Sequence, residues 1–165
     1  MTERAISPGA RSLSEEEVDQ YKEQGYVKNL SVFSPKSVPE LQSRFMDLLD
    51  GIPDNVDICR VNNWHKANRW IYELSRSPAI LDYVEAVQGP DFHLWAGTMF
   101  IKRPRDGKVV PFHKDAGYWP LEPRVNVTAW LAVFDTDSEN GCMRFVPGSH
   151  RQGAIAHEDL PDSPD

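Results

Sequence analysis

Apolar positions in the first part of the chain recur every three to four residues, which predicts short helices. Ser14 and Glu17 form a capping-box pattern just ahead of the apolar pair Val18 and Tyr21. Gly25 is placed to end the helix, because glycine readily adopts the left-handed conformation of a helix C-cap. The pattern therefore predicts an N-terminal helix between Ser14 and Gly25.

A second capping-box pattern, Ser37 with Glu40, comes before a run with apolar residues at helical spacing. The run meets Gly51 and then a proline, so we expect this helix to stop there. Residues 50–67 have no clear period and are interpreted as a loop.

Two more helices are predicted before the chain changes character. The stretch Trp70–Leu74 has helical spacing. Ser77 and Pro78 then resemble an N-cap followed by proline at the first helical position, and Gly89 is placed to end the last helix. The first half of the chain thus consists of four predicted helices.

The second half is rich in β-branched and aromatic residues in short runs bounded by Pro, Gly, Asp and Asn, a pattern typical of strands. The predicted strands are residues 92–101, 109–115, 125–134 and 142–146. Asn140-Gly141 favours a tight turn, so the last two strands are expected to form a hairpin. Helices followed by strands indicate an α+β fold with antiparallel strands.

Length, charge and hydropathy argue against some classes of protein. The 165 residues suit one domain, and residues 1–12 are expected to be a mobile lead-in. A net charge of −7 without a Lys/Arg cluster argues against nucleic-acid binding. No apolar run could span a membrane and no signal peptide is evident, so we expect a cytoplasmic protein without a membrane partner. Cys59 and Cys142 lack metal-site spacing and are interpreted as reduced structural thiols.

His113 and Asp115 are the strongest candidates for chemistry. On a strand, residues two apart point to the same face, so these two side chains would project together while Lys114 points away. An imidazole and a carboxylate are two of the three ligands in the facial triad of non-haem iron oxygenases. A bare H-x-D pattern is common by chance, so its surroundings decide its meaning.

Those surroundings resemble a known family. The runs H-K-D-A-G-Y-W-P at 113–120, V-T-A-W at 127–130 and E-N-G-C-M-R-F-V-P-G-S-H at 139–150 are similar to the phytanoyl-CoA dioxygenase family of Fe(II)- and 2-oxoglutarate-dependent oxygenases. The resemblance spans nearly the whole chain from residue 13. It implies N-terminal helices followed by a double-stranded β-helix, or jelly roll.

The resemblance also implies roles for single residues. His113 and Asp115 would bind Fe(II), and Met99 and Trp130 would line the 2-oxoglutarate pocket. The other partners would be O2 and a small organic substrate. Relatives that halogenate have a small residue in place of the carboxylate, so with Asp115 present the resemblance implies hydroxylation or another oxidation.

The family's second metal-binding His and its 2-oxoglutarate-binding Arg normally lie beyond the P-G-S-H turn, and we find neither here. His150 lies in that turn and His157 follows the last predicted strand, so neither is favoured as a substitute. We therefore interpret residues 13–165 as a domain that lacks its C-terminal strands, an incomplete jelly roll. Such a chain is expected to self-associate through unpaired strands and not to turn over 2-oxoglutarate alone. The alternatives are a non-catalytic remnant serving as an interaction module and a cupin-like metal-binding protein.

Overall fold

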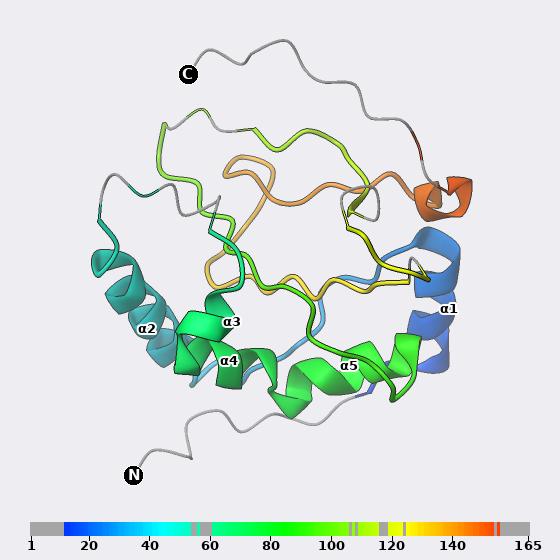
Figure 1. Cartoon of the computed structure of the whole chain (residues 1–165), viewed down its shortest axis with the longest axis horizontal. Coiled ribbons are helices and arrows are strands. Elements are labelled where there is room, and N and C mark those ends of the chain that lie inside the picture. Colours follow the sequence, from blue (N-terminus) through cyan, green and yellow to red (C-terminus); the bar gives the residue numbers. More distant parts are fainter. Residues whose placement is uncertain are drawn as a thin grey trace.

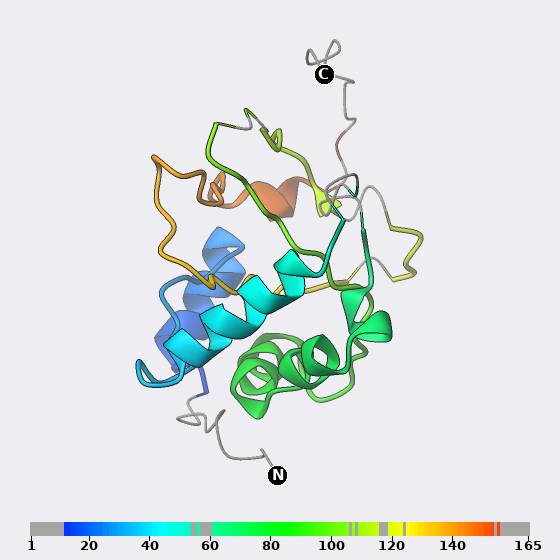
Figure 2. The same cartoon turned by 90° about the vertical axis from the view of Figure 1, so that its left-hand side faces the viewer.

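The computed structural model describes residues 12–53, 56, 61–105, 107, 109–115, 119–123, 125–153 and 155. In this part of the chain, five α-helices are followed by irregular segments and a short 3-10 helix, η3 (Ser149–Gln152). Both views of the chain show the helices on one side and the irregular segments on the other (Figures 1 and 2). We call residues 15–88 the helical half and residues 90–153 the irregular half. Apart from Ser12, the predicted lead-in lies outside the described residues.

The first helix, α1 (Glu15–Gln24), forms where the capping pattern predicts it. The Ser14 hydroxyl accepts a hydrogen bond from the Glu17 amide at 3.2 Å, and the Glu17 carboxylate accepts one from the Ser14 amide at 2.9 Å. Gly25 ends the helix with φ of 86°, a left-handed conformation that favours glycine. The predicted capping box and C-cap are both confirmed.

The second helix, α2 (Val38–Asp50), is also confirmed, but its predicted capping box is wrong. Ser37 already has helical backbone angles, and its side chain makes no cap hydrogen bond. Its hydroxyl lies 2.7 Å from that of Ser34, and Glu40 instead pairs with Arg44 at 2.8 Å. Both residues of the motif are thus engaged elsewhere.

The remaining helices are α3 (Trp64–Ala67), α4 (Arg69–Ser75) and α5 (Pro78–Gln88). The first of them was missed, since it lies in the stretch interpreted as a loop. Asn68 separates α3 from α4, and its side chain accepts a hydrogen bond from the amide of Ile71. The α3 helix packs against α4, and α1 packs against α5.

The hydrophobic core of the described residues lies among these helices. Its buried apolar side chains are Leu41, Ile71, Leu74, Ala79 and Tyr83. Phe45 and Trp70 pack edge to face with ring centroids 4.9 Å apart, which joins α2 to α4. Gln42 donates a hydrogen bond to the Val133 carbonyl at 3.0 Å and so connects α2 to the irregular half. None of the helices in the described ranges is long and apolar enough to cross a membrane.

The irregular half differs from its predicted form. The described parts of the four predicted strand segments contain no strand, and the pairing observed there is an isolated antiparallel bridge between Asn62 and Thr98. A turn is present at residues 138–141, but it is wider than the predicted tight turn: the Cys142 amide donates to the carbonyl of Asp137, five residues earlier, at 2.8 Å. The segments beside this turn are not paired as strands, so the hairpin is not observed. The helical part of the α+β prediction is confirmed, and the incomplete jelly roll stays a prediction.

Candidate metal centre

His113 and Asp115 lie close together in the structure. The Nε2 atom of His113 is 3.2 Å from Oδ1 of Asp115. The two side chains are 31% and 41% exposed, so solvent, a metal ion or a small cosubstrate could reach both. The side chain of Lys114 contacts the carbonyls of Ser149 and Gly153. The two candidate ligands therefore share one small region that is open to solvent.

The tautomer of the His113 ring is indicated by the contact that its Nδ1 atom makes with Pro111. Its Nδ1 atom lies 2.8 Å from the carbonyl oxygen of Pro111, which can only accept, so Nδ1 carries a hydrogen. The Nε2 atom is then the ring nitrogen that faces the Asp115 carboxylate, 3.2 Å from its Oδ1 atom. An imidazole nitrogen beside a carboxylate is a pair of donor groups that suits a metal cation.

Metal-binding histidines commonly donate their other ring hydrogen to a backbone carbonyl or a carboxylate, which fixes the tautomer and the ring orientation. The contact between His113 and Pro111 is of this kind. Thr128 donates from its hydroxyl to Oδ2 of Asp115 at 3.4 Å, a long and therefore weak hydrogen bond to the carboxylate. Both candidate ligands thus have supporting groups, and the residues present fit a divalent metal ion.

Arg144, which comes later in the chain, contacts the segment that carries His113. Its guanidinium carbon lies 5.4 Å from the ring centroid of Phe112, within the range of a cation–π contact. The sequence left open whether this arginine faces solvent or the predicted barrel mouth. The structure places it against the residue before His113.

A third protein ligand is not present among the described residues, where no cluster of three His, Cys, Asp or Glu side chains could hold a metal. His150 contacts α1 instead, with its Nε2 atom 3.1 Å from the Lys22 carbonyl oxygen. His157 lies outside the described residues. His113 and Asp115 would therefore account for two of the three protein ligands that a facial triad requires, if they bind a metal.

Met99 and Trp130 have different surroundings. Met99 is half-buried and follows Thr98, whose hydroxyl donates to the Asn62 side chain at 2.6 Å. Trp130 is 42% exposed and lies two residues after Thr128, which contacts Asp115. Their place in a 2-oxoglutarate pocket stays a prediction.

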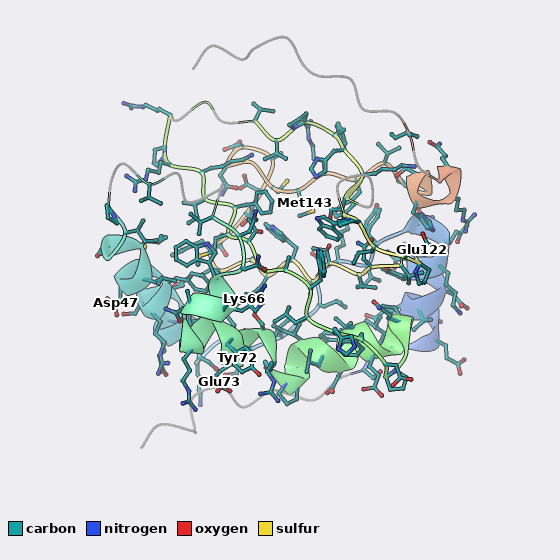
Figure 3. All side chains as sticks on the ribbon, in the orientation of Figure 1. Asp47, Lys66, Tyr72, Glu73, Glu122 and Met143 are labelled. Atoms are coloured by element: carbon teal, nitrogen blue, oxygen red, sulfur yellow. The ribbon has the colours of Figure 1, made fainter. Side chains whose placement is uncertain are left out.

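A separate hollow lies on the helical half, lined by α3 and α4. Its volume is about 430 Å³, and its lining residues are His65, Lys66, Ala67, Arg69, Tyr72 and Glu73. Figure 3 labels three of these residues, which lie together at the surface of α3 and α4, and Met143 on the irregular half.

His65 is only 8% exposed, and its Nδ1 atom has no hydrogen-bond partner in the described part of the chain. Burial, and secondarily the charge of Lys66, lowers the pKa of this imidazole, so the neutral ring is favoured.

Three partners of the candidate site were not predicted from the sequence: the Pro111 carbonyl, the Thr128 hydroxyl and the carbonyls that Lys114 contacts. The first is a backbone carbonyl, which every residue carries, so the sequence gives no signal for it although it lies only two residues from His113. The threonine and the Ser149 turn lie far along the chain, and no local pattern indicates them.

Comparison with known proteins identifies a family for this chain. The sequence profile described as phytanoyl-CoA dioxygenase (PhyH) matches residues 21–165. The chain is 30% identical over 116 residues to the peroxisomal phytanoyl-CoA dioxygenase of Mus musculus, covering 68% of the chain and 34% of the mouse protein. It is 32% identical over 114 residues to that of Homo sapiens, covering 66% and 33%.

A probable phytanoyl-CoA dioxygenase of Caenorhabditis elegans is 35% identical over 95 residues, covering 53% of the chain and 30% of the worm protein. No solved structure gives a significant match. The chain thus spans about a third of the length of the curated relatives that it matches. Since the family profile covers nearly all of the sequence, the chain belongs to the phytanoyl-CoA dioxygenase family.

Proposed function

We propose that this chain carries the iron-binding segment of an Fe(II)- and 2-oxoglutarate-dependent oxygenase that hydroxylates a small organic substrate. The observation that carries the proposal is the pair His113 and Asp115, held 3.2 Å apart with a hydrogen bond to the Nδ1 side of the imidazole. Membership of the phytanoyl-CoA dioxygenase family supports the same chemistry.

Each residue of the candidate metal centre would have a separate role in binding the metal. His113 would bind the metal through Nε2, while the contact of Nδ1 with the Pro111 carbonyl would favour the tautomer whose lone pair is on Nε2. The Asp115 carboxylate would offset the charge of the cation, and the Thr128 hydroxyl donates a weak hydrogen bond to it. The bound iron and 2-oxoglutarate would supply the O2 activation and the oxidation of substrate.

Met99 and Trp130 are proposed to line the 2-oxoglutarate pocket, on the basis of their positions in the family's pattern. The substrate is proposed to be a small organic molecule, and the chain's own residues do not identify it. The cytoplasmic location expected from the sequence stays a prediction, and several relatives carry the word peroxisomal in their names.

The test is a titration of the chain with Mn²⁺, whose free ion is measured by electron paramagnetic resonance. Weak but saturable binding is expected, because two protein ligands leave most of the metal shell to water. Asp115→Ala and His113→Ala should each abolish it, whereas His93→Ala, which changes an exposed histidine, should not. Equal binding by Asp115→Ala and the unaltered chain would show that Asp115 is not a ligand.

A further inference from the structure

Lys114 lies between the two candidate ligands and points to a different part of the chain. Its Nζ atom donates to the carbonyl of Ser149 at 2.8 Å and to the carbonyl of Gly153 at 2.6 Å. Hydrogen bonds from a charged donor are shorter and stronger than neutral ones. These carbonyls lie at the first residue of η3 and at the residue just after its end. One ammonium therefore joins the His113–Asp115 segment to both ends of this turn.

The turn around η3 is itself attached to α1. The Gly148 amide donates to the Gln24 carbonyl at 2.8 Å, and the side chains of His150 and Arg151 both contact the Lys22 carbonyl, at 3.1 and 3.2 Å. These carbonyls belong to the last turn of the helix, where backbone acceptors lack partners within the helix. Figures 1 and 2 both show η3 beside the end of α1.

Two further features make this contact specific. Tyr26 and Phe145 stack with ring centroids 4.7 Å apart, just beyond the helix and just before the turn. A Cβ atom on Gly25 would lie 2.5 Å from Nδ1 of His150, so the close approach depends on the glycine. The turn is thus fixed on a capped helix, and Lys114 connects the metal-ligand segment to that fixed point.

The anchor matters because residues 111–114 have no regular secondary structure of their own. Neither strand pairing nor a helix holds their backbone in the described structure. Metal affinity depends on ligands that are already held in position, and partners that support ligands are commonly worth about 10- to 100-fold in affinity.

We infer that Lys114 is a positioning residue: by binding the carbonyls of Ser149 and Gly153, it holds His113 and Asp115 in place for the metal. This inference rests on the proposed metal site and names the residue that organises it. Lys114 does not touch the metal in this proposal; it acts through the backbone of its two neighbours.

The first experiment compares metal affinity in variants of the whole chain. Lys114→Met removes the ammonium and keeps the length of the side chain, and Lys114→Arg keeps a cationic donor. The matched control is Lys102→Met, since Lys102 also donates to a turn carbonyl, that of Gly141 at 3.4 Å, away from the H-x-D segment. Mn²⁺ affinity is measured by electron paramagnetic resonance, and melting temperature by circular dichroism.

Lys114→Met is expected to bind Mn²⁺ about tenfold more weakly or worse than the unaltered chain. Lys114→Arg should recover most of this loss, and Lys102→Met should show none. A purely structural role of Lys114 would lower the melting temperature of Lys114→Met and would leave the Mn²⁺ affinity of the folded protein unchanged. Equal Mn²⁺ affinity in Lys114→Met and Lys102→Met would overturn the proposal.

A second measurement needs no variant and decides the question if Lys114→Met does not fold. If the anchored lysine favours metal binding, then bound metal must favour the anchored lysine by the same factor. Saturating Mn²⁺ should therefore slow acetylation of Lys114 relative to Lys102 in the unaltered chain, as measured by peptide mass spectrometry. An unchanged ratio would contradict the inference. Binding of Mn²⁺ that survives Asp115→Ala would instead refute the proposed site itself, and the inference with it.

Discussion

His65 is a buried titratable side chain whose pKa is lowered, mainly by burial and then by the charge of Lys66. The folded protein thus resists protonation of this ring, while the unfolded chain takes up the proton near the ordinary value of 6.5. The free energy of unfolding should therefore fall as the pH drops below that value, because protons then favour the unfolded state.

The measurement is the melting temperature between about pH 7 and about pH 5, the range in which an ordinary histidine titrates. His65→Gln should lose part of the decline, since it removes the group that the folded state keeps neutral. His93→Gln, at an exposed position, should retain it. A decline that is identical in all three proteins would mean that His65 does not control acid stability here.

Single residues also show which contacts of the candidate site could be predicted from the sequence. The sequence predicted that His113 and Asp115 lie together because residues two apart on a strand share a face. They do lie close, although residues 109–115 form no strand, because a separation of two residues is local in any backbone. Lys114 was expected only to point away from them. Its partners, Ser149 and Gly153, lie 35 and 39 residues further on, and such contacts depend on how the whole chain folds.

Among the elements, α1 depends on a capping box that makes both of its hydrogen bonds, whereas Ser37 makes no cap bond to α2. Ser14→Ala is therefore expected to reduce the free energy of unfolding by about 1 kcal/mol. In a chain of this size that corresponds to a fall of about 2–4 °C in melting temperature.

Ser37→Ala is the matched control, since it removes the same group from the same motif at the next helix. Its melting temperature should change little, because the substitution removes only an exposed hydrogen bond between the Ser37 and Ser34 hydroxyls. Thermal unfolding followed by circular dichroism distinguishes the two outcomes. An equal loss of stability in both variants would mean that the observed cap bonds do not govern it.

The contrast between Ser14 and Ser37 shows why the sequence predicted both helices correctly but only one of the two caps. Both helices were predicted because apolar spacing is a strong signal, but a capping motif only permits the cap geometry. At α2 the backbone of Ser37 is already helical, which moves the side chain away from the amides it would cap. The four-residue helix α3 was missed because so short a stretch cannot display a helical period.

At the scale of the whole molecule, the two halves were not equally predictable. The helices α2, α4 and α5 bury apolar side chains in the core, so local periodicity and tertiary packing agree there. In the irregular half the alternating residues predict strands, but strand pairing needs partners distant in the sequence, and the described segments are not paired with one another. Side chains with strand-like patterning therefore remain uncovered.

The uncovered apolar side chains lead to the last prediction. Val109 is 76% exposed and Val125 is 62% exposed, both on segments that are not paired as strands among the described residues. Apolar surface next to unpaired strand-like segments favours association with other chains, here a second copy of the same chain. The chain is expected to form assemblies that grow with concentration, as measured by light scattering.

The double variant Val109→Lys with Val125→Lys should shift this distribution toward monomer, because two charges oppose burial of the same surface. Met46→Lys is the matched control: it also changes an exposed apolar residue, 46% accessible, but on α2 in the helical half. Its assemblies should remain like those of the unaltered chain, which would locate association on the irregular half. A monodisperse monomer of the unaltered chain would contradict the prediction. If Met46→Lys shifted the assemblies as much as the double valine variant does, the predicted location of the association surface would be contradicted. That surface would then include the helices.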